Sequence, residues 1–193
     1  MATLTIPEQD RTLTDPSEIS DYLSTMGIWY RRFEAGTEIP AEASAEEVLA
    51  AFAEPIETLK EEGGYGTADV IHITPELEGL ETMLAKFDKE HWHSEDEVRF
   101  IVEGQGLFHL RGEDGPVVRL QVVAGDMINV PASTKHWFHL CDDRRIRAIR
   151  LFQDPAGWVA NYTDSGQEKN FAPLCFGPAY LQGEAPLEGP LDV

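Results

Sequence analysis

Glu90-His91-Trp92-His93-Ser94-Glu95-Asp96-Glu97-Val98-Arg99 is the most informative stretch of the chain. In an extended strand, side chains alternate between faces and each residue advances about 3.3 Å, so His91 and His93 project on the same side. Glu97 and Arg99 share that parity. Two imidazoles and one carboxylate from one strand region are typical ligands of a redox-active divalent metal with open coordination positions. The stretch therefore predicts a metal site that contains His91, His93 and Glu97.

A solitary histidine, His136, follows about forty residues later and is predicted to supply a third imidazole. Gly125, five intervening residues and Pro131 precede it, and four residues separate Pro131 from His136. This spacing, together with that of His93, Glu97 and the later glycine, resembles the paired motifs of the cupin superfamily. Cupins are small β-barrels that carry a metal inside.

Two positions depart from the cupin motifs, because Ala85 and Ser133 stand where glycine is usual. Neither departure removes a ligand. The alternative interpretation of residues 90–99 is an acidic, solvated loop that happens to contain two histidines. The length of the matched spacing favours the metal site over that alternative.

The composition limits the number of domains and the kinds of partner that can be expected. A chain of 193 residues with 42% hydrophobic content can bury one sizeable core, which predicts a single domain. With 15 basic and 35 acidic residues, the net charge of −20 repels phosphate backbones and anionic lipid surfaces, so neither nucleic acid nor a membrane is an expected partner. An anionic substrate would need positive charge supplied inside its pocket. We expect a cytoplasmic protein, since no apolar run is long enough for a signal or a membrane span, and a monomer.

The pattern of turns and apolar residues predicts a mainly β fold, a cupin-type jelly-roll barrel with a few flanking helices. The barrel is expected at about residues 68–152, after a mixed lead-in at 1–67 and before an irregular tail at 153–193. One lead-in helix is expected between Asp15 and Gly27, and a second after the capping box of Ser44 and Glu47, with a kink or break at Pro55. The predicted barrel strands are Asp69–Ile73, Val98–Glu103, Gly106–Arg111, Val117–Val122, Asp126–Val130, Lys135–Leu140 and Arg145–Phe152.

The two cysteines, Cys141 and Cys175, lie far apart and lack metal-ligand spacing. We expect two reduced thiols without a function. Structural zinc is disfavoured because neither cysteine belongs to the histidine cluster.

Arg99 shares the interior face with Glu97 and is predicted to present its guanidinium to a substrate oxygen, with a barrel salt bridge as the alternative. Arg150 is a second candidate for the same cavity, although Arg145 and Arg147 compete for that position. Three aromatic residues are candidates for an apolar wall, with core packing as the alternative: Phe87, Phe138 and Trp158. Three histidines fall outside the motif and are not expected to bind metal: His72, His109 and His139.

Four protein ligands on an octahedral metal leave two adjacent positions, which suit a chelating substrate such as an enediolate or an α-keto acid. This favours oxygen chemistry or Lewis-acid chemistry. Two alternatives stay open: a Lewis-acid cupin such as an isomerase or decarboxylase, and a non-catalytic cupin that binds a small molecule.

The run from Glu90 to Gly104, with Gly106-Leu107-Phe108-His109 and Arg147-Ala148-Ile149-Arg150-Leu151-Phe152, resembles the acireductone dioxygenase family of methionine salvage. The resemblance implies that His91, His93, Glu97 and His136 bind one Fe(II) or Ni(II) ion, and that the substrate chelates it through its enediol oxygens. It also implies a catalytic role for Arg99, supporting roles for Glu90 and Asp96, and a place beside the substrate for Phe87, Phe138 and Trp158.

In that family the metal decides the product. With iron, dioxygen cleaves acireductone to formate and the keto acid precursor of methionine. With nickel, the products are formate, carbon monoxide and 3-methylthiopropionate. The sequence leaves the choice of metal open.

Overall fold

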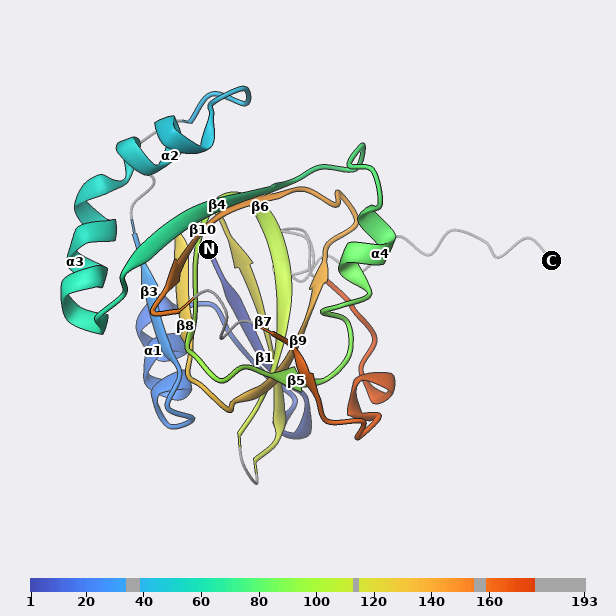
Figure 1. Cartoon of the computed structure of the whole chain (residues 1–193). Helices are drawn as coiled ribbons and strands as arrows, with labels where there is room; N and C mark the ends of the chain where they lie inside the picture. The colour runs from blue at the N-terminus through green and yellow to red at the C-terminus, as the bar shows by residue number, and fades with distance from the viewer. Residues whose placement is uncertain (34–38, 113–114, 155–158, 176–193) are drawn as a thin grey trace, which may run out of the picture.

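The structure is a computed structural model, and it describes residues 1–33, 39–112, 115–154 and 159–175. Its strands form an antiparallel sheet that folds into two facing halves around an interior (Figure 1). This arrangement confirms the predicted cupin-type, mainly β fold. One half has the strand order β11-β5-β9-β6-β7-β1-β2, and the other joins β3, β8, β6, β10 and β4.

The strands have the following bounds: β1 Thr3–Ile6, β2 Arg11–Leu13, β3 Trp29–Arg32, β4 Thr67–Ile73, β5 His91–Trp92, β6 Glu97–Arg111, β7 Val117–Val123, β8 Asp126–Val130, β9 Lys135–Leu140, β10 Ile146–Phe152 and β11 Asn161–Tyr162. The helices are α1 Pro16–Ser24, α2 Ala45–Ala51, α3 Ala53–Gly63 and α4 Leu80–Leu84, with short 3₁₀ turns at Pro7–Gln9 and Gln167–Asn170. No helix of the described residues is both long and apolar enough to cross a bilayer.

Strand β6 belongs to both halves of the sheet. The prediction of two separate strands, Val98–Glu103 and Gly106–Arg111, is wrong because a single strand covers both ranges. Its first part pairs with β8 and β10, and its second part pairs with β7 and β9. Between them Gly104 has φ +75°, and the register against β10 shifts between Arg147 and Ala148. A glycine in the left-handed region bends the strand without breaking it, so one strand crosses from one half to the other.

The helices form where local signals predict them, with one correction. Asp15 accepts hydrogen bonds from the backbone N–H groups of Ser17 and Glu18 and so caps α1. Ser44 and Glu47 make the predicted capping box of α2. The break expected at Pro55 occurs at Phe52, and Pro55 lies in the first turn of α3. A proline is tolerated there because first-turn N–H groups have no partner within the helix.

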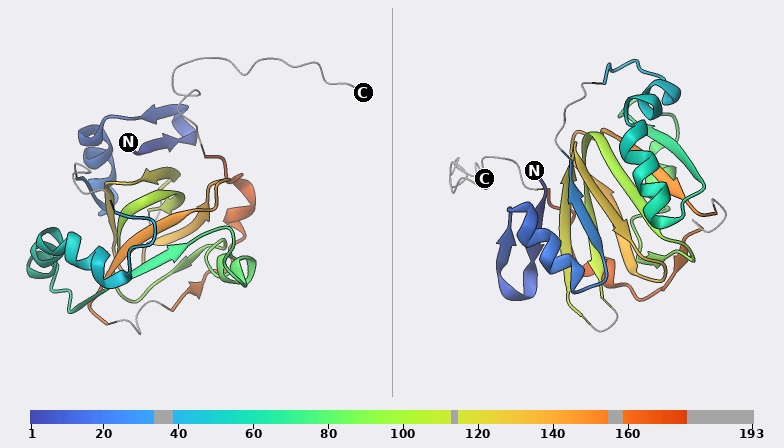
Figure 2. Two further views of the ribbon diagram at one scale, coloured as in Figure 1. Left: turned by 90° about the horizontal axis from the view of Figure 1, so that it is seen from above. Right: turned by 90° about the vertical axis from the view of Figure 1, so that its left-hand side faces the viewer.

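Two layers of apolar side chains hold the halves and helices together. The interior layer contains Leu110, Ile101 and Phe108 among its buried residues. The second layer joins the outer face of β6, β8 and β10 to α2 and α3, which cover that face (Figure 2). Its buried members are Val48, Ile56, Leu59, Tyr65, Val98, Phe100, Met127, Ile149 and Leu151. Helices α2 and α3 of the lead-in therefore pack against the exterior of the barrel.

Segments on either side of the predicted barrel also contribute strands. Strand β1 pairs with β7 and β3 pairs with β8, so the lead-in at residues 1–67 extends both halves. Strand β11 pairs with β5. These pairings support a single domain, which we retain as a proposal.

The prediction that the two cysteines are reduced thiols is wrong. Cys141 and Cys175 form a disulfide, with Cα atoms 5.7 Å apart. Their separation of 34 residues in sequence carries no spacing signal. Only the return of the chain after β11 brings them within bonding distance.

Replacing Gly104 with alanine tests the importance of the bend in β6. A Cβ at position 104 would lie 2.0 Å from the backbone oxygen of Arg145, and φ would stay at +75°. We expect Gly104→Ala to lower the free energy of unfolding by roughly 3 kcal/mol or more in urea titrations. Gly27 is the matched control, because its φ is +74° and nothing lies within 4 Å of an added Cβ. Gly27→Ala should cost only about 1 kcal/mol; equal losses would contradict this role of Gly104.

Candidate metal centre

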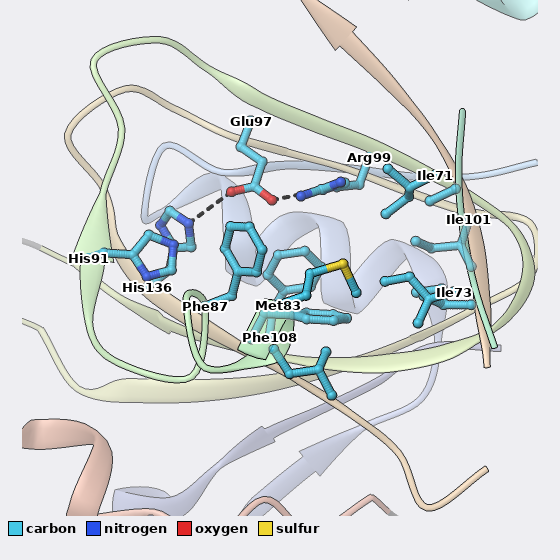
Figure 3. Close-up of a pocket in the computed structure, with 14 residues that line it drawn as sticks. Ile71, Ile73, Met83, Phe87, His91, Glu97, Arg99, Ile101, Phe108 and His136 are labelled. Atoms are coloured by element: carbon cyan, nitrogen blue, oxygen red, sulfur yellow. Dashed lines mark hydrogen bonds and ion pairs between the residues drawn. The ribbon is translucent and has the colours of Figure 1, made fainter. Parts of the chain in front are cut away.

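Four side chains from three strand regions meet at one end of the barrel interior. His91 lies on β5, His93 follows that strand, Glu97 begins β6 and His136 lies on β9. His91 and His136 are directly paired across β5 and β9. All four residues are buried, and one ligand atom from each lies within 4.8 Å of the others. The structure thus brings together the complete set of ligands predicted from the sequence. Figure 3 shows His91, Glu97 and His136 of this set.

Backbone carbonyl groups orient the three imidazole rings. The Nδ1 atom of His91 lies 2.7 Å from the oxygen of Lys89, and that of His136 lies 2.8 Å from the oxygen of Thr134. The Nδ1 atom of His93 lies 3.0 Å from the oxygen of Val159. Because a carbonyl can only accept, each Nδ1 must donate its proton, which leaves the lone pair of Nε2 for a metal.

Glu97 is the charged centre of this cluster. Its Oε2 lies 2.9 Å from Nε2 of His136 and 3.2 Å from Nε2 of His93, while Oε1 accepts a 2.8 Å hydrogen bond from Nε of Arg99. Burial by itself would raise the pKa of Glu97. The positive charge of Arg99 is the largest effect that opposes burial, and the pKa of Glu97 lies well below its usual value. The carboxylate is therefore ionised and ready to ligate.

The donor set fits a divalent metal. Burial, followed by the neighbouring His136, lowers the pKa of His91 to about 4. A neutral imidazole is the form that binds metal. Three neutral nitrogen donors and one carboxylate oxygen match imidazole-favouring metals such as iron and nickel.

The metal cluster forms the polar end of a cavity inside the barrel (Figure 3). Arg99 lines it next to Glu97, and Phe87 and Phe138 lie on its wall. The remaining wall is apolar. It consists of Ile71, Ile73, Met83, Leu84, Ile101, Phe108, Ile146 and Ala148.

Arg150 does not line this cavity. It lies directly opposite Arg99 in the pairing of β10 with β6. Its guanidinium binds the carboxylate of Asp69, at 2.7 Å from Nε and 2.5 Å from the second nitrogen. The predicted substrate contact of Arg150 has no support in this arrangement, because strand register places the side chain against β4 instead. Trp158, the third aromatic candidate, lies outside the described residues.

Comparison with known proteins assigns the family. Residues 7–160 match the model of the ARD/ARD′ family. The chain belongs to the ARD/ARD′ family. A relative named acireductone dioxygenase from Picosynechococcus sp. is 42% identical over 171 residues, which cover 89% of this chain and 97% of the relative. Another of that name, from Aquifex aeolicus, is 40% identical over 161 residues and covers 83% and 87% of the two chains.

A solved structure agrees with this family assignment. Acireductone dioxygenase from Bacillus anthracis, which holds a cadmium ion in its active centre, matches with a TM-score of 0.79 and 34% identity. The match covers 84% of this chain and 98% of that one. Both the cupin-type fold and the ARD/ARD′ family membership predicted from the sequence are confirmed.

Two acidic residues next to the ligands of this ARD/ARD′ family member accept several hydrogen bonds. The buried carboxylate of Glu90 accepts two hydrogen bonds from Arg111, at 2.7 and 2.9 Å, and one each from Thr163 and Ser165 at 2.5 Å. Burial would raise the pKa of Glu90, but these donors lower it. Glu90 thereby fixes the start of β5, which presents His91.

Asp96 fixes the start of β6 in the same manner. It accepts hydrogen bonds from the hydroxyl of Tyr65, the amide of Asn129 and the backbone N–H of Ala132, at 3.2, 3.2 and 3.0 Å. These groups come from the connection between α3 and β4, from β8 and from the loop before β9. Asp96 thus holds its neighbour Glu97 between the two halves of the sheet.

The histidines excluded by sequence lie away from the metal cluster. His109 is buried and stacks on Trp137 with ring centroids 4.7 Å apart, and His139 lies beside it. His72 lies 3.3 Å from a guanidinium nitrogen of Arg147. Within the described part of the chain, these three are not members of any grouping of potential ligands suited to a metal.

Several site residues were not predicted. The carbonyl of Val159 and the hydroxyls of Thr163 and Ser165 reach the site from the tail, and no local pattern marks them. The position of Ile101 on the cavity wall could have been predicted, because Ile101 lies on the same face of β6 as Glu97 and Arg99.

The depressed pKa of His91 predicts how the stability of the metal-free protein depends on pH. The folded pKa of about 4 lies below the unfolded value of 6.5, so the unfolded state binds more protons between these values. Stability should therefore fall as the pH drops through that window, by about 2 kcal/mol between pH 7 and pH 5 from His91 alone. Urea unfolding at both pH values measures this loss. His91→Gln should reduce the difference by that amount, and an unchanged difference would contradict the assignment.

Proposed function

We propose that this chain is a metal-dependent dioxygenase that cleaves acireductone, 1,2-dihydroxy-3-keto-5-methylthiopentene, with dioxygen in methionine salvage. The central observation is a cavity with three of the four buried metal ligands and a largely buried arginine at one end and apolar side chains elsewhere. A small molecule with an acidic, chelating head and an apolar tail matches that division. Family membership and the names of the relatives support the same substrate.

His91, His93, Glu97 and His136 would hold one Fe(II) or Ni(II) ion. When bound, that ion would supply redox chemistry toward dioxygen and Lewis-acid polarisation of the enediol oxygens. The three backbone carbonyls on Nδ1 keep the imidazoles in the ligating tautomer. The ionised Glu97 contributes the one negative charge of the ligand set.

Arg99 is the proposed catalytic residue. Its guanidinium is held by Glu97 at the cavity wall, so its position is set before substrate arrives. A fixed positive charge in a buried site stabilises the deprotonated enediol more than the neutral form. This local charge also offsets the repulsion expected from a protein of net charge −20.

The apolar wall would hold the methylthio tail and exclude water from the reacting carbons. Phe87 and Phe138, which are close in sequence to the ligands His91 and His136, form part of this wall. The isoleucines of β4 and β6 extend it. Exclusion of water strengthens the interaction of Arg99 with the substrate anion, because the local dielectric is lower.

The choice of metal, and hence of products, is best decided by reconstitution. Metal-free protein loaded with Fe(II) is expected to convert acireductone to formate and 2-keto-4-methylthiobutyrate. Protein loaded with Ni(II) should yield formate, carbon monoxide and 3-methylthiopropionate. In both cases the substrate should persist under anaerobic conditions until dioxygen is admitted. Consumption at the same rate without dioxygen would count against the proposal and favour a Lewis-acid enzyme.

We also propose that the enzyme acts as a monomer in the cytoplasm on a small molecule and dioxygen. The high net negative charge disfavours association of identical chains. Light scattering across a range of protein concentrations measures the oligomeric state.

Arg99→Lys separates substrate binding from metal binding. Lysine keeps a charge but lacks the planar fork that donates to Glu97 and a substrate oxygen together. We expect unchanged nickel content and a loss of about 100-fold in kcat/KM. Arg150→Lys is the matched comparison on the neighbouring strand and should lose less than about 3-fold, because Arg150 binds Asp69. Normal turnover of Arg99→Lys would overturn its proposed role.

A further inference from the structure

The disulfide closes a segment that reaches the metal centre. Cys141 directly follows β9, the strand that carries His136, and Cys175 ends the described tail. We call described residues 159–175 the C-terminal strap. It includes β11 and the 3₁₀ turn Gln167–Asn170, and it passes alongside β5 (Figure 1).

The strap holds the ligand-bearing strand from one side. The Val159 carbonyl accepts the hydrogen bond that orients His93. Tyr162 pairs with His91 in the sheet. The backbone N–H of Thr163 donates to the oxygen of Glu90 at 3.1 Å. Two metal ligands therefore depend on the strap for their orientation.

The same strap neutralises part of a buried charge. The hydroxyls of Thr163 and Ser165 donate to Oε2 of Glu90, which is buried immediately before His91. Departure of the strap would leave Arg111 as the only side-chain donor to Glu90 among the described residues. A buried carboxylate that loses donors is costly, so the start of β5 would rearrange with the strap.

The far end of the strap is anchored chiefly through the disulfide. Phe171 packs near Trp137 and His109, with ring centroids 5.8 and 6.1 Å apart. Beyond it the chain is exposed up to the disulfide, and Leu174 is 57% exposed. Cys175 itself is partly exposed, whereas Cys141 is only 3% exposed. Of the two cysteines, Cys175 is therefore the one that a thiolate from outside would attack.

We propose that Cys141–Cys175 is a redox modification site for a dithiol protein, and that its state controls how firmly the strap holds Glu90, His91 and His93. A thiolate of the dithiol attacks Sγ of Cys175, the bond between the two cysteine sulfurs breaks, and Cys141 leaves as a thiolate and takes up a proton. The second thiol of the partner then displaces Cys175 and closes the partner's own disulfide. Two electrons and two protons pass to this chain, and an oxidised partner reverses the reaction.

Breaking the bond alters dynamics more than contacts. The hydrogen bonds described above for the strap do not involve either sulfur, so they survive reduction, but the strap is no longer closed covalently and opens more often. Groups that orient metal ligands typically change metal affinity by about 10- to 100-fold when removed. Loosening the strap should have a smaller effect, about 5-fold faster metal release. This last step depends on the proposed metal centre, whereas the opening of the strap does not.

The experiment uses the full chain in two redox states. Mass spectrometry after thiol alkylation should show a disulfide that a dithiol protein such as a thioredoxin opens and its oxidised form restores. Hydrogen exchange of metal-free protein should show about 5-fold or greater loss of protection at Tyr162 and Thr163 after reduction with a phosphine. The Ni(II)-loaded protein, challenged with a chromogenic chelator, should release metal about 5-fold faster when reduced.

Two variants control these measurements. The double variant Cys141→Ser/Cys175→Ser should release Ni(II) as fast as the reduced protein does, and the phosphine should not change that rate. Thr163→Val loosens the strap without touching the sulfurs, so it should release Ni(II) faster in both redox states. A bond that the dithiol protein cannot open, or equal exchange in both states, would overturn the proposal. A redox effect on exchange without Ni(II) binding would uphold the redox site and reject only the proposed metal centre.

Discussion

The ionised carboxylate of Glu97 is the constraint around which the barrel end is organised. A buried charge must be compensated, and Arg99 on the same strand does so with a 2.8 Å hydrogen bond. The imidazoles of His136 on β9 and His93 after β5 lie 2.9 and 3.2 Å from the same carboxylate, where they can share a cation with it. Closure of the barrel brings these strands together and so assembles the metal ligands.

A second layer of contacts makes that arrangement rigid. Backbone carbonyls hold the three imidazoles, Glu90 ties β5 to Arg111 and to the tail, and Asp96 ties β6 to α3 and β8. None of these groups needs to touch a substrate. They determine where the ligating nitrogens point, and orientation of this kind governs how tightly and how selectively a site holds its metal. The C-terminal strap belongs to this layer, which is why a distant disulfide bears on the metal centre.

The cavity has a polar end and an apolar remainder. One end presents an arginine, a carboxylate and imidazoles, and the remainder is lined by isoleucine, phenylalanine and methionine side chains. Strand alternation explains the proximity, because Glu97, Arg99 and Ile101 follow one another on the same face of β6. The opposite face of that strand, with Val98 and Phe100, packs under α2 and α3. The inner face of β6 thus carries residues of the site, and its outer face carries residues of the second apolar layer.

Local geometry was enough for much of this protein to be read from sequence. The parity of His91, His93, Glu97 and Arg99, the helix caps at Asp15 and Ser44, and the strand alternation depend on neighbouring residues, so they could be predicted from local patterns. The cupin-type barrel and the family were predicted from the resemblance of the motifs to those of known families. The continuous strand bent at Gly104, the diversion of Arg150 to Asp69, the strap and the Cys141–Cys175 bond were decided by tertiary structure alone. Each of these depends on which distant segments pair and in what register, and no pattern within a few residues encodes that choice.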